Sequence, residues 1–419
     1  MNKTLPLILT VALAGCPGPT PPTPPTPPSI CEASTDWITS PSMPSEVPEA
    51  ETFCDFYQFS WQWFLAQVSP DPANGMPKFL ENRVYEPTGG TGQCANEALT
   101  GVAGIQAALR PRTVKAQDFE EVQADSNALY DKNGNVVHYN AFYTQALCDS
   151  TPAGFAPGTL EMKAAWMKLD GDVSDYFTIT VEMNDAPVRL GLIGLHLAIW
   201  TPNHPEMIWV SWEHKKNAPL CNGHSTGTSW ALASDDAAAC LRGNMLDRDG
   251  PPSRECDSFK FNTPDTLPSG DVPLTGTPNN VCREYDHGNQ SGESVNGNDN
   301  TENIIAIEEL NEALVGPQGM LSSLAPDNPM AIWANYEMVG GLWTKDGANS
   351  GSPPPVPSKQ GPANPDSPQR GSLELANMSL ETFQQGDESY IPNCFGCHNY
   401  DSTKPLDVSH IQSKLIISE

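Results

Sequence analysis

Residues 190–214 read LGLIGLHLAIWTPNHPEMIWVSWEH. Two apolar runs, from Leu190 to Trp200 and from Met207 to His214, flank a polar stretch at 201–206 that contains two prolines. Apolar runs of this length, bounded by turn-forming residues, are typical of buried strands. The stretch therefore predicts a β-hairpin with its loop at 201–206.

The segment before this hairpin extends the same pattern. Phe177, Ile179, Val181 and Met183 alternate with polar residues, which is the period of a half-buried strand. We therefore expect residues 159–214 to form antiparallel strands. A further hairpin is expected at 130–137, around the Asn133-Gly134 pair.

Helical periodicity appears elsewhere in the chain. In residues 53–68 the apolar residues fall on one helical face, and Pro70 and Pro72 end the pattern: Phe53, Phe56, Tyr57, Trp61, Phe64, Leu65 and Val68. Residues 302–314 and 373–385 are also expected to be helices, with a Gly-, Pro- and Ser-rich surface loop at 344–372 between them. The fold class predicted is α+β, with a central antiparallel sheet, flanking helices and a C-terminal segment at 373–419.

That C-terminal segment contains Cys394-Phe395-Gly396-Cys397-His398. Cys-x-x-Cys-His is the attachment signature of c-type haem, in which two thiols hold the haem covalently and the histidine binds the iron. The alternatives are a redox Cys-x-x-Cys pair and a disulfide that happens to precede a histidine. A thioredoxin-like motif belongs to a βαβ unit, which the preceding residues 389–393 do not indicate.

The N-terminus carries an export signal. Lys3 precedes a short apolar stretch over 5–13, which is too short to cross a bilayer comfortably. The signal, residues 1–15, ends at Leu13-Ala14-Gly15-Cys16, which resembles a bacterial lipobox, so lipidation is expected at Cys16. An ordinary signal peptide with an unrelated cysteine is the alternative. Residues 16–35 then form a proline-rich tether, followed by a body over 36–343.

The cysteine count agrees with export. Of 11 cysteines, Cys16 is assigned to lipid and Cys394 and Cys397 to haem, and the remaining eight are Cys31, Cys54, Cys94, Cys148, Cys221, Cys240, Cys256 and Cys282. An even remainder in an oxidising compartment predicts four disulfides, although the sequence does not fix their connectivity. Zinc binding is the alternative, but the spacings are long and irregular.

Charge limits the partners. The formal net charge is −29 and the pI about 4.4. We expect no nucleic-acid partner, because such binding needs a basic face. An acidic surface can steer a basic redox protein toward the chain, and it equally serves solubility.

Several short blocks resemble an uncharacterised family of bacterial c-type cytochrome lipoproteins. They lie at residues 61–64 (WQWF), 161–166 (EMKAAW), 194–196 (GLH), 209–214 (WVSWEH), 375–377 (LAN) and 394–398 (CFGCH). The resemblance implies a periplasm-facing protein with one covalent haem c, and it implies no particular reaction.

The sequence does not decide which residue is the sixth ligand of the iron. Class I cytochromes c place a Met ligand far downstream of the motif, but only 21 residues follow His398 and none is Met. The position near the C-terminus is similar to that in cytochromes c′ and P460, whose iron often has five ligands. We predict His410 as the distal ligand, with Met378, His196 and His214 as further candidates.

His196 and His214 also form a possible pair. If the hairpin register places them on one face, then with Glu161 or Glu213 they can bind a metal or line a haem pocket. Two hydrogen-bonded structural histidines are the alternative.

The sequence thus favours a monohaem electron-transfer protein, lipid-anchored and exported, at the outer membrane facing the periplasm or at the cell surface. The alternatives are a haem enzyme of peroxidase or P460 type with an open iron position, and a haem-based sensor.

Overall fold

In the computed structural model the chain divides into two compact units, residues 1–30 and residues 31–419. The structure describes residues 31–85, 94, 99–109, 128–171, 174–227, 229–243, 256–264, 272–288, 300–345, 369–385, 394–398 and 400–416. The predicted signal peptide, the lipidation site Cys16 and most of the tether lie outside the described residues. Cys31, from the end of the tether range, is buried in the second unit.

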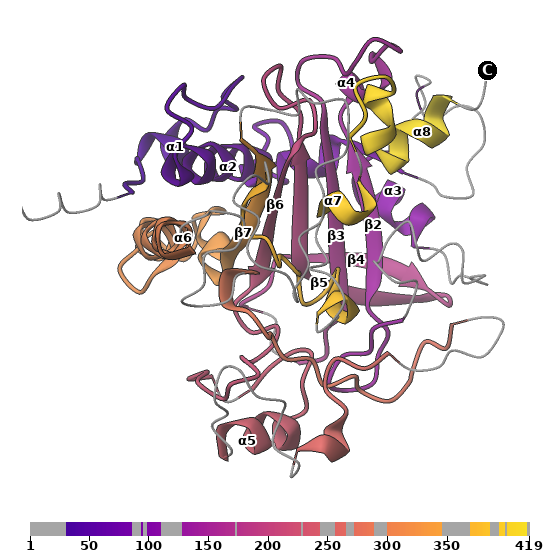
Figure 1. The fold of residues 1–419 in the computed structure, drawn as a ribbon. Coiled ribbons are helices and arrows are strands. Elements are labelled where there is room, and N and C mark those ends of the chain that lie inside the picture. Colours follow the sequence, from indigo (N-terminus) through magenta and orange to yellow (C-terminus); the bar gives the residue numbers. More distant parts are fainter. Residues whose placement is uncertain are drawn as a thin grey trace, which may run out of the picture. The chain divides into compact units, whose positions relative to one another are not determined.

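One antiparallel sheet dominates the described residues (Figure 1). Its strand order is β1-β2-β3-β5-β6-β7-β8, and β4 pairs with β5 outside this path. The strands are β1 (Arg83–Val84), β2 (His138–Tyr143), β3 (Leu160–Lys168), β4 (Thr178–Met183), β5 (Ala186–Ile199), β6 (Ile208–His214), β7 (Tyr336–Thr344) and β8 (Gln369–Gly371). The predicted α+β class with a central antiparallel sheet is confirmed.

The helices lie around this sheet. They are α1 (Asp36–Thr39), α2 (Phe53–Val68), α3 (Gly101–Ala108), α4 (Gln145–Cys148), α5 (Asp235–Gly243), α6 (Asn300–Val315), α7 (Cys394–Cys397) and α8 (His410–Ile416). Short 3-10 turns complete the list: Lys78–Glu81, Asp257–Phe259, Asp286–Gly288, Ala331–Asn335, Thr382–Gln384 and Pro405–Val408.

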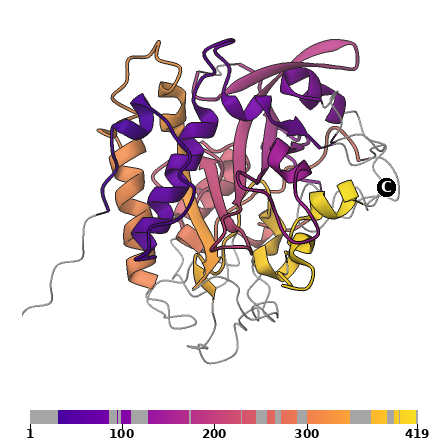
Figure 2. The same cartoon turned by 90° about the horizontal axis from the view of Figure 1, so that it is seen from above.

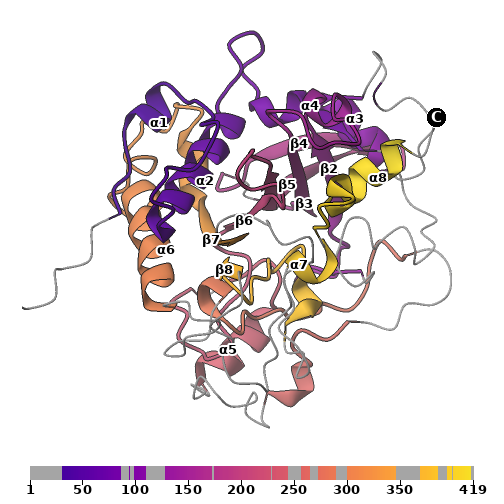
Figure 3. The same ribbon diagram turned by 45° about the horizontal axis from the view of Figure 1, so that its top comes forward.

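Helices α2 and α6 cover one face of the sheet (Figure 2). The aromatic side of α2 is the centre of this core: Phe64 stacks on Trp212 of β6 with ring centroids 4.6 Å apart. Burying aromatic side chains of this size is a large favourable term in folding. The opposite face receives the C-terminal segment with α7 and α8, so the sheet separates the main core from the predicted haem segment (Figure 3).

The predicted local elements are largely confirmed. Helix α2 spans the expected 53–68, and a capping box between Thr52 and Asp55 fixes its start. The hairpin of β5 and β6 forms around the 201–206 loop, with Ile199 opposite Ile208. The Asn-Gly turn is present as well: Tyr130 bridges Val136, and Gly134 adopts a φ of 77°, which favours glycine.

Two expectations near the C-terminus are wrong. Residues 373–385 form turns and one 3-10 turn instead of a helix, because buried polar side chains in this segment hydrogen-bond to the sheet. Asn377, for example, donates to Ser211 Oγ at 2.8 Å and to the carbonyl of Trp212 at 3.1 Å. The expected loop 344–372 contains sheet residues at both ends, Thr344 in β7 and β8 at 369–371.

The eight remaining cysteines form four disulfides, as predicted. The pairs are Cys31–Cys54, Cys94–Cys148, Cys221–Cys282 and Cys240–Cys256. The last two hold the loop-rich region between β6 and α6. Among the described residues, no helix combines the length and the apolar character that a membrane span requires.

Candidate haem-attachment site

The C-terminal segment is held on the sheet by its own apolar side chains. Phe395 of α7 is fully buried in a cluster that also contains Ala198 of β5 and Trp209 of β6. Further members from the segment are Tyr400, Leu406, Val408 and Ile411. This packing places the Cys-x-x-Cys-His motif against the centre of the sheet.

The motif itself forms one helical turn. Cys394 begins α7 and Cys397 ends it, and His398 follows directly. Cys394 is half-buried and packs against the same apolar cluster. His398 is 9% exposed, and its ring lies against the indole of Trp209 with centroids 4.2 Å apart.

One hydrogen bond sets the tautomer of His398. Its Nδ1 donates to the carbonyl oxygen of Val408 at 2.8 Å. Burial, followed by the nearby charges of His410 and Lys163, lowers the pKa of His398 well below its usual value. The imidazole is therefore neutral, with the proton on Nδ1 and the lone pair on Nε2. This is the state in which a histidine binds a metal, with the second nitrogen held by a backbone carbonyl.

His410 lies next to His398, but not in the position of an opposite ligand. The two rings stack with centroids 4.1 Å apart and planes inclined by 23°. Two ligands on opposite sides of one iron point nitrogens at each other across the haem plane, and a stacked pair leaves no space for that plane. His410 as the distal ligand stays a prediction, and it requires α8 to shift relative to α7.

Glu161 lies beneath the same segment. Its Oε1 accepts a hydrogen bond from the hydroxyl of Ser409, and that hydroxyl oxygen in turn accepts from the backbone N–H of Gln412 at 2.7 Å. Burial raises the pKa of Glu161 to about 7. The predicted candidate is thus a buried carboxyl whose protonation changes near neutral pH.

His196 lies on the same sheet face. Its Nε2 is 2.8 Å from Glu381 Oε2, and the residue opposite it on β3 is Lys163. Although burial acts in the other direction, His196 and then Lys163 lower the pKa of Glu381 overall. The charges of Lys163 and His196 both lower the pKa of His398, so these groups lie near it.

His214 is separated from this group. His196 pairs with Ser211, and the β5–β6 register continues without a shift to Gly194 opposite Glu213. His214 is three residues after Ser211, so the two histidines lie on opposite faces of the sheet. His214 Nε2 donates to the carbonyl of Asp175 at 3.0 Å, and its ring stacks on Tyr176. Burial lowers the pKa of His214 to about 4. His214 thus has the hydrogen bond and the packing that the structural alternative expects.

Glu213 and Met378 also contact other parts of the fold. Glu213 shares the His196 face, where its Oε1 lies 2.8 Å from Arg283 Nη2 and accepts from the backbone N–H of Met378 at 2.7 Å. Met378 is fully buried in a different apolar cluster from Phe395, and its sulfur lies 3.3 Å from Gln385 Nε2.

Sequence reasoning missed Lys163, Trp209, Glu381 and Ser409. Strand alternation places Lys163 on the face of Glu161, which was a usable signal. The other three approach the motif through tertiary packing, which leaves no local pattern.

The residues present suit the attachment of a haem and one of its iron ligands. The spacing of the motif and the neutral, oriented His398 fit covalent attachment and one axial ligand, whereas the stacked His410 supplies no second ligand as placed. Within the described ranges, no group of three or more His, Cys, Asp or Glu side chains forms a metal site. Comparison with protein families, curated proteins and solved structures finds no match.

Proposed function

We propose that this protein is an exported, lipid-anchored c-type cytochrome with one covalent haem, and that it transfers electrons. Cys394 and Cys397 would hold the haem, and His398 would bind its iron from one side. The haem would supply the redox chemistry, and the chain would supply attachment, orientation and a dry surface.

The observation that carries the proposal is the His398–Val408 hydrogen bond. If the two cysteines formed only a disulfide, nothing would require His398 to be buried with Nδ1 bonded to a carbonyl. Burial of this imidazole costs free energy, and iron ligation by its Nε2 would offset that cost. The apolar cluster around Phe395 and the Trp209 indole exclude water from this side of the ring.

Export and anchoring support the same proposal. Haem c attachment takes place outside the cytoplasm in bacteria, and four disulfides indicate an oxidising compartment. A lipid on Cys16 would tether the folded unit to the outer membrane, facing the periplasm or the cell surface. The mass of the N-terminal peptide tests this acylation directly.

Covalent haem is the decisive test. The full chain, produced in a host with haem c maturation machinery, should retain its haem after denaturing acid and organic-solvent extraction. The Cys394→Ser/Cys397→Ser variant should lose covalent haem completely. Haem that is extracted from wild type, or retained by the variant, would contradict the proposal.

A second candidate is a haem enzyme with an open iron position. It is favoured by the titratable groups beneath the motif, because Glu161, Lys163 and His196 all lie on the face that His398 occupies. A carboxyl with a pKa near 7 suits general acid–base catalysis at neutral pH. The visible spectrum separates the two candidates, since electron carriers have six-coordinate low-spin iron and open sites have five-coordinate high-spin iron. A haem-based sensor would share the open site.

A further inference from the structure

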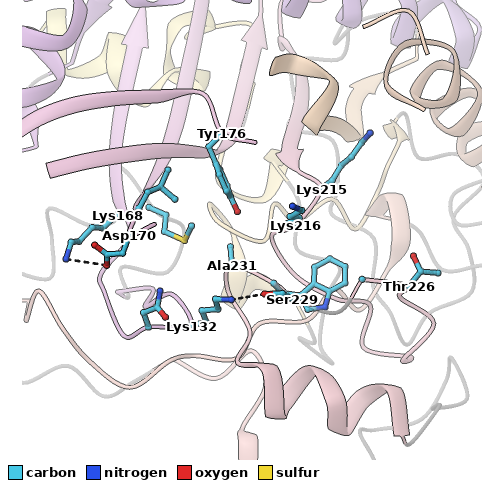
Figure 4. A pocket seen from close by; sticks show the side chains of 14 residues that line it. Lys132, Lys168, Asp170, Tyr176, Lys215, Lys216, Thr226, Ser229 and Ala231 are labelled. Atoms are coloured by element: carbon cyan, nitrogen blue, oxygen red, sulfur yellow. Dashed lines mark hydrogen bonds and ion pairs between the residues drawn. The ribbon is translucent and has the colours of Figure 1, made fainter. Parts of the chain in front are cut away.

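A cavity of about 600 Å³ lies at the end of the sheet where β3 and β6 finish (Figure 4). Its walls come from the turn after β3, from the residues directly after β6, from Tyr176, and from loop residues at 132–133, 226–227 and 229–231. None of these lining residues belongs to the predicted haem site.

Lysines are common in the wall of this cavity. Four are among its lining residues, at positions 132, 168, 215 and 216, although Lys215 Nζ donates to the carbonyl of Val315, which is not a lining residue. Asp170 is the one acidic lining residue, and Asp235 and Asp175 pair with Lys132 and Lys216 from outside the lining. The whole chain has 51 Asp and Glu against 22 Lys and Arg. A cationic hollow in so acidic a protein would focus the local field on an anionic ligand.

The lysines have weak partners that a ligand can replace. Lys168 lies 3.6 Å from Asp170 and Lys216 contacts Asp175, with all four side chains exposed. Lys132 donates to Ser229 Oγ at 2.8 Å inside the cavity. Exposed ion pairs of this kind contribute little to stability, so their ammonium groups can turn to a bound anion at small cost.

The aromatic walls of the cavity are rigid. The Tyr176 ring is fixed by stacking on His214, with ring centroids 4.0 Å apart. Trp230 is 9% exposed, so its indole is held by the surrounding chain and forms an apolar wall. A Cβ at position 227 would lie 2.6 Å from Trp230 Cζ2. Glycine at this position therefore allows the indole to pack directly against the backbone of Gly227.

We propose that this cavity binds a small aromatic anion, a planar ring system that carries a carboxylate or sulfonate. The anionic group would meet Lys132 and Lys216, and the ring would lie between Tyr176 and Trp230. Met167 and Leu169 complete the apolar wall. This site is independent of the haem proposal.

The test uses two fluorescent probes with the same aromatic body. Anilinonaphthalene sulfonate carries the anion, and phenylnaphthylamine lacks it. The full chain should bind the sulfonate with one-to-one stoichiometry and at least about tenfold more tightly than the neutral probe. Equal affinity for both probes would overturn the role of charge.

Variants locate the site. Lys132→Ala/Lys216→Ala should weaken sulfonate binding about tenfold, whereas Lys345→Ala, an exposed lysine outside the cavity, should leave it unchanged. Trp230→Leu removes an aromatic wall and should weaken binding of both probes about threefold. Unchanged affinity in the double lysine variant, with an unaltered circular dichroism spectrum, would overturn the proposal.

Discussion

His398 and His410 lie side by side because of the turn between them. The turn Pro405–Val408 leads from α7 to α8, and the carbonyl of Val408 accepts a hydrogen bond from His398 Nδ1. The same turn therefore orients His398 and places the His410 ring against it, with centroids 4.1 Å apart. If His398 binds a haem iron as proposed, His410 would become the second ligand only after α8 moves.

We predict that His410→Ala changes the coordination of the iron. Wild type should be low-spin, and the variant should become high-spin and bind carbon monoxide at least about tenfold faster in the ferrous form, because a strong ligand is lost. The exposed His224→Ala variant is the control. If wild type is already high-spin and binds carbon monoxide rapidly, the site is open, and Glu161, Lys163 and His196 become the first residues to test.

Glu161 predicts a pH-dependent stability. Its pKa rises from an ordinary carboxyl value near 4.5 to about 7 on folding, so the folded state binds more protons between these pH values. Stability is therefore highest below about pH 4.5 and falls by up to about 3 kcal/mol as the pH rises through 7. Glu161→Gln should remove this loss.

Denaturant unfolding of both proteins at pH 5 and pH 8 measures the difference. The gap between wild type and variant should change with pH, in favour of the variant at pH 8. Glu182→Gln, an exposed carboxyl on β4, controls for the loss of one charge. A gap that stays constant with pH would show that Glu161 does not titrate in this range.

At the scale of elements, prediction succeeded where a segment's own pattern matches its environment. The α2 helix has one apolar face and a capping box, and the β5–β6 hairpin has apolar strands and a polar loop. Residues 373–385 looked helical because their apolar residues are spaced suitably. There, Asn377 and Ser379 are buried and bonded to the sheet and to each other, and Ser379 Oγ occupies the space that a side chain at Gly194 would fill. Tertiary contacts of this kind override local propensity.

Sequence and packing also contribute differently to the candidate site. Cys394, Cys397 and His398 could be proposed from the sequence because haem c attachment requires a fixed spacing of these residue types. The carbonyl of Val408 and the Lys163 side chain were not, because distant segments bring them together through packing. The separation of His196 from His214 depended on hairpin register, which only the paired strands fix.

The lengths of the loops that two of the disulfides close predict which disulfide stabilises the fold more. Cys221–Cys282 spans 61 residues and Cys240–Cys256 spans 16. Because a longer loop loses more entropy in the unfolded chain, removal of the first pair should cost about 4 kcal/mol and removal of the second about 3 kcal/mol. Denaturant unfolding of the two Cys→Ser double variants checks this. A larger loss for the shorter loop would show that local packing around α5 outweighs loop entropy.

At the scale of the whole molecule, charge is the dominant feature. A net charge of −29 repels acidic proteins and attracts basic ones over roughly a Debye length, about 10 Å at 0.1 M salt. The lysine-lined cavity is a local exception, which suits a small anion better than a protein. A protein redox partner should therefore be basic and should meet the acidic surface.

This charge predicts the salt dependence of electron transfer. The second-order rate of reduction by a small basic carrier protein should fall at least about tenfold between low salt and about 0.5 M salt, because screening removes electrostatic steering. Stopped-flow absorbance at the haem band measures the rate. An acidic carrier of similar potential is the control, and its slower rate should rise with salt. A rate with the basic carrier that does not depend on salt would show that the acidic surface serves solubility alone, and it would leave covalent haem attachment unaffected.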